Sequence, residues 1–325
     1  MKIKTVLGSI GNTPVVQLPF ASPATLLAKL EYLNPGGSIK DRSALYMIEQ
    51  AEKHGLLKPG GTIIDASSGN HGISLALIGA AKGYKVIITV SQKCSKEKYL
   101  TLKAYGAEVI VCPPTEFIEH PDSYHSVAKE LVKATPNSYM PNQYFNTENA
   151  DGHYHLLGPE LWEQTEGKIT HFFAGAGTGG TASGAGRYLK EKNPAIKVYG
   201  IDAATSFRAT KGNPKPYKIE GLGIDFDSNV IDYSVIDEIL EVTDDSALNM
   251  LKVLAHEHGL LAGPTSGAVA AAIASQLPNF KAGDLVVGIF GDSGRAYLSK
   301  NFYCQNEDIL QLSPRIFDKN RMHIP

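Results

Sequence analysis

The sequence alternates short apolar runs with helical segments along most of its length. "GTIIDA" precedes a helix expected at 70–82, and "YKVIITV" precedes another expected at 95–105. After residue 146 the pattern resumes with a helix around 158–165, and "THFFAGAG" then leads into a helix at 180–192. Buried strands that alternate with helices build parallel sheets, because each helix carries the chain back to the start of the next strand. The alternation therefore predicts an α/β fold.

A chain of 325 residues is long enough for two smaller domains that share a cleft. We expect two open, mostly parallel sheet subdomains around a central cleft. Residues 1–38 and 147–303 are assigned to a large domain, 39–146 to a small mobile domain and 304–325 to an irregular C-terminal tail. Ligands of open α/β sheets bind at the carboxyl ends of the strands. The cleft between the sheets is therefore the expected binding site.

Composition and charge limit the partners that this chain can have. The net charge is −2, with 43% hydrophobic and 20% charged residues, as in soluble globular proteins, so nucleic acid is not an expected partner. The 3 cysteines lie far apart, which argues against a disulfide framework or a zinc site. Neither a signal peptide nor a membrane span is apparent. We therefore expect a cytoplasmic protein that binds a small molecule and no metal.

The segment "NPGGSIKDR" places a lysine directly after a glycine-rich turn. Ser38 can cap a helix that begins at Ile39, which fixes Lys40 in the first turn. Burial and the positive end of the helix dipole both lower the pKa of an amine in that position. Such a lysine can act as a nucleophile or form an imine. The alternative is a solvent-exposed Lys40 paired with Asp41 or Glu49.

A glycine-rich turn between the strand "THFFAGAG" and the following helix is the strongest local signal. Its candidate ligand-binding residues are Gly177, Thr178, Gly179, Gly180 and Thr181. Exposed backbone N–H groups at a helix N-terminus bind phosphate. The same stretch also fits the dinucleotide pattern G-x-G-x-x-G, and Asp202 ends the next strand where a ribose-binding acid is expected. An NAD-dependent oxidoreductase is therefore a second hypothesis.

Two further loops lie between a strand or turn and a helix. "DASSGNHG" can hold a carboxylate with hydroxyls and backbone amides at a helix N-terminus, or it is an ordinary polar cap. "AGPTSGAV" is a similar small-residue entry in which Thr265 or Ser266 can cap the helix. The segment "GDSGR" resembles a serine-protease loop, but the chain offers no suitable histidine and aspartate before it.

Taken together, "NPGGSIKDR", "SSGNHG", "GAGTGGT" and "GPTSGA" resemble, in this order, the fold-type II pyridoxal-phosphate enzymes. The closest resemblance is to the cysteine synthase/cystathionine β-synthase family. It implies that Lys40 forms the internal aldimine with pyridoxal 5'-phosphate and that the glycine-rich turn holds the phosphate. Asn70 would contact the 3-hydroxyl oxygen of the cofactor, and Thr265 would face its pyridine nitrogen. The resemblance implies that the substrate-binding residues are Ser67, Ser68, Gly69, His71, Gln143 and Gly221.

Within this family, "HPDSYHSVA", "NQYFN" and "EGLGIDF" are similar to bacterial cystathionine β-synthases. The resemblance implies β-replacement on serine or an activated serine through an aminoacrylate, with homocysteine as acceptor and cystathionine as product. Sulfide, as in O-acetylserine sulfhydrylases, and an amine are alternative acceptors, and a homodimer is expected. A catalytically dead binding module would show a damaged lysine or phosphate loop, and neither is damaged. His71, Ile224 and Thr265 depart from the family pattern, which leaves the substrate and the acceptor open.

Overall fold

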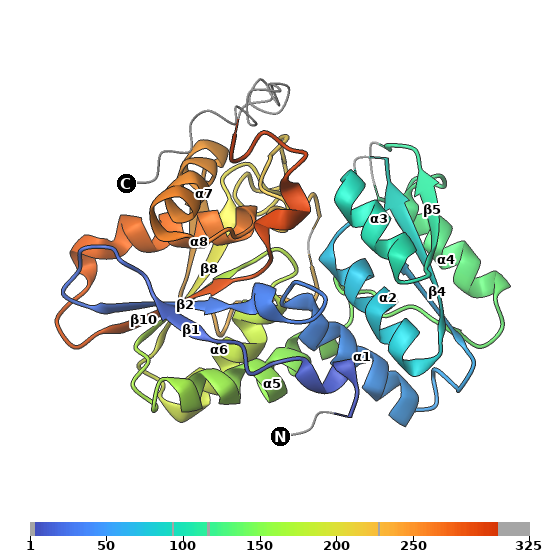
Figure 1. Ribbon diagram of the computed structural model, residues 1–325, viewed down its shortest axis with the longest axis horizontal. Coiled ribbons are helices and arrows are strands. Elements are labelled where there is room, and N and C mark those ends of the chain that lie inside the picture. The colour runs from blue at the N-terminus through green and yellow to red at the C-terminus, as the bar shows by residue number, and fades with distance from the viewer. Residues whose placement is uncertain (1–3, 93, 116–117, 227, 305–325) are drawn as a thin grey trace, which may run out of the picture.

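A computed structural model describes residues 4–92, 94–115, 118–226 and 228–304, which form two sheets in two adjoining lobes (Figure 1). The first sheet has the strand order β1 (Val15–Gln17), β2 (Thr25–Leu30), β10 (Leu285–Phe290), β7 (His171–Gly175), β8 (Lys197–Ala203) and β9 (Glu238–Val242). The second has the order β5 (Glu108–Cys112), β4 (Lys85–Ser91), β3 (Thr62–Ala66) and β6 (Ser138–Tyr139). In these sheets β1 and β2 pair antiparallel and the other neighbours pair parallel. The predicted α/β class with two mostly parallel sheets is confirmed.

Helices cover both faces of each sheet. On the first sheet, α7 (Asp244–His258) and α8 (Pro264–Gln276) lie on one face, and α5 (Glu148–Gln164) and α6 (Gly180–Lys192) lie on the other (Figure 1). On the second sheet, α1 (Lys40–Lys53), α2 (Asn70–Lys82) and α3 (Lys96–Ala104) share one apolar core, and α4 (Tyr124–Ala134) packs on the opposite face. Short 3₁₀ helices lie at η1 (Val6–Ser9), η2 (Glu31–Leu33), η3 (Leu277–Asn279) and η4 (Gly294–Tyr297). Helix α1 packs against both α2 and α5, so it joins the two lobes.

The start of α1 differs slightly from the expectation. The helix begins at Lys40, and Ile39 is its N-terminal flanking residue. The Ser38 hydroxyl accepts a hydrogen bond from the Lys40 backbone N–H at 3.2 Å. The prediction that Ser38 is the N-cap is therefore wrong by one position, although the Ser38 hydroxyl still binds the N–H of the first helical residue.

The described residues also contain no helix that is long and apolar enough to cross a membrane. Within the same ranges, no group of three or more His, Cys, Asp or Glu side chains is arranged to hold a metal ion. Residues 305–325, which make up nearly all of the tail expected at 304–325, lie outside the described part of the chain.

Candidate active site

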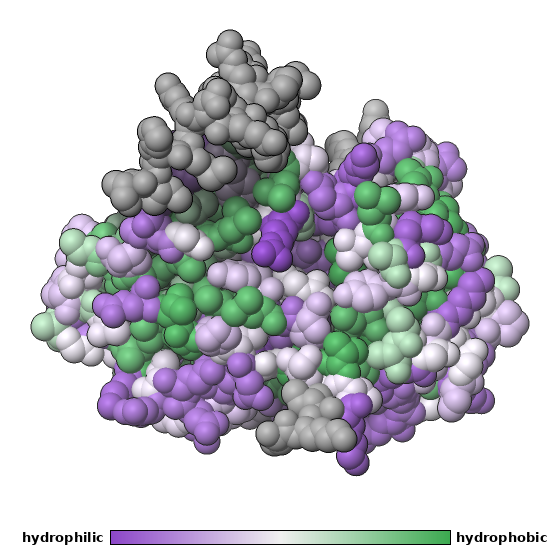
Figure 2. Space-filling view, in the orientation of Figure 1, coloured by the Kyte–Doolittle hydropathy of each residue, from purple (hydrophilic) through white to green (hydrophobic). Residues whose placement is uncertain are grey.

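A central cavity of about 530 Å³ lies where the loops at the carboxyl ends of β3, β7 and β8 meet the start of α1. Figure 2 shows the surface hollowed between the two lobes, with hydrophilic side chains gathered at the hollow. The expected site residues that line the cavity are Lys40, Ser67, Ser68, Gly69, Asn70, His71, Gln143, Gly177, Thr178 and Gly221. These residues come from segments far apart in the sequence, and the fold brings them to one place.

Lys40 contributes an amine to the cavity. Burial lowers the pKa of the Lys40 amine to about 8, and the Asp292 carboxylate partly opposes this shift. The Asp41 carboxylate is directed elsewhere, because it accepts hydrogen bonds from the Gly36 N–H at 2.6 Å and the Ser74 hydroxyl at 2.5 Å. The structure therefore does not show the Lys40–Asp41 pair that the sequence left open. At neutral to slightly alkaline pH a useful fraction of Lys40 is neutral and nucleophilic.

The loop at 67–71 presents the N-terminus of α2 to the cavity. The Ser67 hydroxyl accepts the Gly72 N–H at 3.0 Å, and the Ser68 hydroxyl accepts the Ser91 N–H at 2.7 Å. Both side chains thereby hold the loop while they line the cavity. Free N–H groups in the first turn of a helix attract an anion. This arrangement suits a substrate carboxylate.

His71 forms a buried pair with Asp65 at the end of β3. The His71 Nε2 atom lies 3.1 Å from the Asp65 carboxylate, and both side chains are almost fully buried. Among the described residues, His71 Nδ1 is buried without a hydrogen-bond partner. A carboxylate partner favours the tautomer that carries its hydrogen on Nε2. In the neutral ring, Nδ1 is therefore left as an acceptor beside the carboxylate loop.

The glycine-rich turn at 177–181 packs tightly against the segment around Gly221. A Cβ atom on Gly177 would lie 2.3 Å from the Gly221 carbonyl oxygen, and Gly179 adopts a φ of +86°. The Thr178 hydroxyl accepts the Gly180 N–H at 3.3 Å. Thr181 lies 3.3 Å from His153 Nε2, measured from its hydroxyl. Gly177 and Thr178 line the cavity, whereas Gly179, Gly180 and Thr181 are not among the described residues that line it.

Thr265, at the second position of α8, is not among the described residues that line the cavity, but it packs against its wall. Its hydroxyl donates a hydrogen bond to the Glu220 carbonyl oxygen at 3.0 Å. A Cβ atom on Gly221 would lie 2.7 Å from the same hydroxyl oxygen. Thr265 thus packs directly against a residue that lines the cavity. Its contact with a pyridine nitrogen stays a prediction.

Several charged residues in or directly behind the cavity wall were not expected from the sequence. The Asp292 carboxylate accepts hydrogen bonds from the Asn70 amide at 2.7 Å and from the Tyr297 hydroxyl at 2.5 Å. Burial raises the pKa of Asp292, although Lys98 and these hydrogen bonds oppose the shift. Asp292 belongs to the "GDSGR" segment, where a polar run directly after a buried strand could have indicated a site.

A second unexpected group joins Lys98, Glu220 and Lys300. The Lys98 amine lies 2.6 Å from the Glu220 carboxylate, and the Lys98 side chain is only 3% exposed. Lys300 pairs with the other oxygen of Glu220. All three residues line the central cavity. Burial lowers the pKa of Lys98. Charged side chains that line a cavity are available to bind a charged ligand.

The same geometry tests the two cofactors that the sequence suggested. Asp202 is fully buried, and its carboxylate accepts hydrogen bonds from the Ser206 hydroxyl, the Arg208 guanidinium and the Gly223 N–H. It is therefore not free to bind a ribose. By contrast, a lysine of lowered pKa beside a tight glycine loop and a helix N-terminus fits an aldehyde cofactor with a phosphate group.

Comparison with known proteins agrees with this geometry. Residues 6–292 match the family model described as "Pyridoxal-phosphate dependent enzyme". A cystathionine beta-synthase of Apis mellifera is 43% identical over 91% of this chain, which spans 60% of the length of that protein. A cysteine synthase of Staphylococcus aureus is 42% identical over 90% of this chain and 95% of its own length. The crystal structure of an O-acetylserine dependent cystathionine beta-synthase from Helicobacter pylori, 38% identical, matches with a TM-score of 0.87 over 93% of this chain and 99% of that chain. The chain therefore belongs to the family of pyridoxal-phosphate dependent enzymes.

Proposed function

We propose that the protein catalyses a β-replacement on serine or an activated serine, with homocysteine as acceptor and cystathionine as product. The family, the similarity to proteins named cystathionine beta-synthase and cysteine synthase, and the cavity all support a β-replacement. The choice of homocysteine over sulfide depends on one observation, the charged group of Lys98, Glu220 and Lys300 in the cavity.

In this proposal each cavity residue has a distinct task. Bound pyridoxal phosphate supplies an electron-accepting ring that stabilises charge at the α-carbon of the substrate. Lys40 holds the cofactor and moves the proton at that α-carbon, for which a pKa of about 8 is suitable. The hydroxyls and N–H groups at 67–71 bind and orient the substrate carboxylate. The N–H groups of the glycine-rich turn hold the phosphate.

The charged group favours an acceptor that itself carries both a positive and a negative charge. Homocysteine carries a carboxylate and an ammonium group, which the two lysines and Glu220 can bind. Sulfide carries neither group and needs no such partners. A buried cation such as Lys98 is costly unless it is paired. Glu220 provides that partner, and the pair leaves charged groups in the cavity wall that a zwitterionic acceptor can contact.

A pair of lysine variants tests the acceptor. The holoenzyme is supplied with serine or O-acetylserine and either homocysteine or sulfide, and cystathionine and cysteine are measured by mass spectrometry. We expect cystathionine as the main product. Lys98→Met should raise the KM for homocysteine about tenfold, because it removes one charge-assisted hydrogen bond. The control Lys96→Met changes an exposed lysine on the same helix and should leave this KM unchanged.

The opposite outcome would be a reaction with sulfide and none with homocysteine. If sulfide alone yields product, the protein is a cysteine synthase and the homocysteine proposal is wrong. If Lys98→Met lowers the rates with both acceptors equally, the charged group acts on the first substrate or on the fold. Loss of β-replacement with every donor and acceptor would contradict the reaction class itself.

A further inference from the structure

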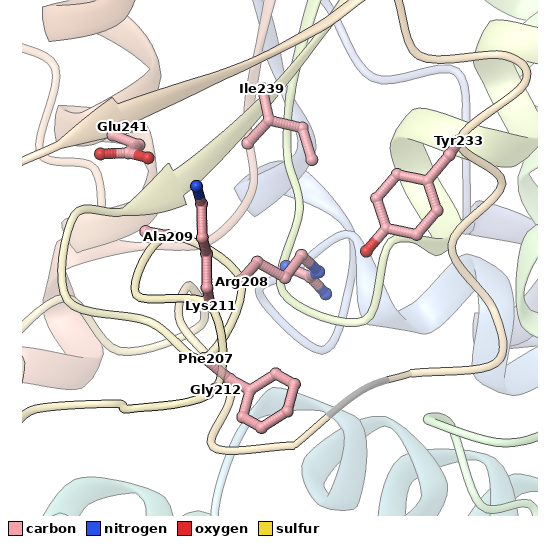
Figure 3. Close-up of a pocket in the computed structure, with 8 residues that line it drawn as sticks. All are labelled: Phe207, Arg208, Ala209, Lys211, Gly212, Tyr233, Ile239 and Glu241. Atoms are coloured by element: carbon pink, nitrogen blue, oxygen red, sulfur yellow. The ribbon is translucent and has the colours of Figure 1, made fainter.

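The loop after β8 carries a buried cation, Arg208, whose charge is balanced by Asp202. Figure 3 shows Arg208 among the side chains that line a pocket of about 400 Å³ on the large lobe. The Arg208 side chain is only 7% exposed, and its guanidinium lies 3.0 Å from the fully buried Asp202 carboxylate. A buried charge is costly unless it is paired. The pairing explains how the charge is tolerated, but a guanidinium has five N–H donors and the others need partners as well.

Those other donors of Arg208 bind two consecutive carbonyl groups at the glycine-rich turn. Nη1 donates to the Ala176 carbonyl oxygen at 2.5 Å, and Nη2 donates to the Gly177 carbonyl oxygen at 2.7 Å. The next carbonyl, that of Thr178, accepts a hydrogen bond from the Ser228 hydroxyl at 2.8 Å. Three successive carbonyl groups are therefore held by side chains that come from other segments of the large lobe.

The direction of these carbonyl groups sets the direction of the backbone N–H groups. In a trans peptide the C=O and the N–H lie in one plane and point in opposite directions. The N–H groups of Gly177 and Thr178 therefore point away from Arg208, and neither is hydrogen-bonded to another described residue. Both residues line the central cavity. Arg208 thus fixes, from outside the cavity, two donors that the turn can offer to a ligand.

The same ion pair also holds the loop that packs against the turn. Asp202 accepts a hydrogen bond from the Gly223 N–H at 3.1 Å, two residues after Gly221. A Cβ atom on Gly177 would lie 2.3 Å from the Gly221 carbonyl oxygen, so the two loops touch at these glycines. Arg208 and Asp202 therefore fix the two loops relative to each other at the cavity wall.

We propose that Arg208 is a positioning residue of the cofactor site, which aims the N–H groups of Gly177 and Thr178 at the phosphate of pyridoxal phosphate. The inference rests on the phosphate-binding role that the proposed function gives to the glycine-rich turn, and not on the choice of acceptor. Donors that are fixed in advance bind an anion more tightly, because binding then orders nothing further. A donor on each carbonyl oxygen also polarises the peptide group and strengthens its N–H as a donor.

Calorimetric titration of the apoenzyme with pyridoxal phosphate and with pyridoxal, which lacks the phosphate, tests this role. We expect Arg208→Lys to weaken the binding of pyridoxal phosphate at least about tenfold and that of pyridoxal less than about twofold. A lysine keeps the charge beside Asp202, but it lacks the planar fork that binds two carbonyl groups at once. Lys211→Met changes an exposed residue of the same loop and should leave both affinities unchanged.

The double variant Arg208→Met with Asp202→Asn tests the same role with both charges removed. It leaves no unpaired buried charge, so it keeps the test possible if Arg208→Lys does not fold. The amide oxygen of the new asparagine can still accept the Gly223 N–H. We expect the same selective loss of affinity for pyridoxal phosphate, and circular dichroism verifies the fold of each variant.

The ratio of the two affinities separates positioning of the phosphate from a purely structural role. Equal weakening of pyridoxal phosphate and pyridoxal in the Arg208 variants would show general damage to the lobe and overturn the proposal. Unchanged affinity for pyridoxal phosphate would overturn it as well. If the unmodified protein binds pyridoxal phosphate no more tightly than pyridoxal, the phosphate-binding role of the turn in the proposed function is itself wrong. These measurements need no turnover, so they are independent of the acceptor.

Discussion

A buried network of four charges anchors the helix that carries Lys40. Arg42 lies two residues after Lys40, and its guanidinium binds both Glu31 and Glu160 with contacts of 2.7 to 2.9 Å. Lys29 pairs with Glu160 as well. The side chains of Lys29, Arg42 and Glu31 are at most 2% exposed, and that of Glu160 is 11% exposed. Glu160→Gln leaves this network with one uncompensated positive charge.

Two arguments give the size of the effect. Burial alone would raise the pKa of Glu160, but hydrogen bonds and charges from Arg42 and Lys29 lower it from 4.5 to about 2. A shift of that size corresponds to about 3 kcal/mol of folding free energy at pH 7. Independently, removal of one partner from a buried ion pair costs about 3 to 5 kcal/mol. We therefore expect Glu160→Gln to lower the free energy of unfolding by about 3 to 4 kcal/mol.

The pH dependence follows from the direction of the shift. Because the pKa of Glu160 is lower in the folded chain, its contribution is complete above pH 4.5 and is lost as the pH falls toward 2. From about 3 kcal/mol at pH 7 it declines by about a quarter at pH 4. Urea unfolding at both pH values measures the difference between the variant and the unmodified protein. Glu163→Gln, an exposed position on the same helix, should change stability by less than about 0.5 kcal/mol. A cost below about 1 kcal/mol for Glu160→Gln, or a cost that grows as the pH falls, would refute the reasoning.

Other predictions concern the central cavity. Lys40→Ala should lower turnover by at least about a thousandfold with an unchanged circular dichroism spectrum, and near-normal rates would contradict the role of Lys40. Uptake of pyridoxal phosphate by the apoenzyme, followed by absorbance, should rise with pH and level off above about pH 8, because only the neutral amine reacts. Asp292→Asn should shift that profile to lower pH, since it removes the charge that raises the pKa of Lys40; a shift to higher pH would contradict this. Gly177→Ala should weaken cofactor binding at least tenfold by calorimetry, because its Cβ would meet a backbone oxygen at 2.3 Å; unchanged affinity would show that the loop can yield.

Helices with a regular local pattern could be predicted from the sequence, whereas α5 could not. Expected helices at 70–82 and 180–192 match α2 and α6. The helix expected around 158–165 instead begins at Glu148 and contains Pro159. Its second half buries Leu157 and Leu161, but the residues buried in its first half are small or polar and give no apolar period. A Cβ atom on Gly184 of α6 would lie 1.9 Å from the Ala150 carbonyl, so close packing of two helices stabilises α5.

Motifs indicated the residues around the cavity, but not their partners across it. Lys40 and the loop at 67–71 could be found because glycines and a helix start accompany them in the sequence. Asn70 and Asp292 are 222 positions apart, and Lys98 and Glu220 are 122 apart. A contact across such a separation leaves no local pattern. Only the meeting of the two sheets brings these charges together.

The segment "NPGGSIKDR" owes its arrangement to three consecutive side chains with different surroundings. Successive residues of a helix point about 100° apart, so Lys40, Asp41 and Arg42 cannot share one environment. Lys40 lines the cavity, Asp41 accepts the Gly36 N–H and so closes the turn, and Arg42 enters the buried network with Glu31 and Glu160. A Cβ atom on Gly36 would lie 2.3 Å from the Asp41 carboxylate, which is why glycine precedes the helix. The position of the Lys40 amine is therefore determined by the two charged residues that follow it. A substitution of Asp41 or of Arg42 should move the amine, although Lys40 itself is unchanged.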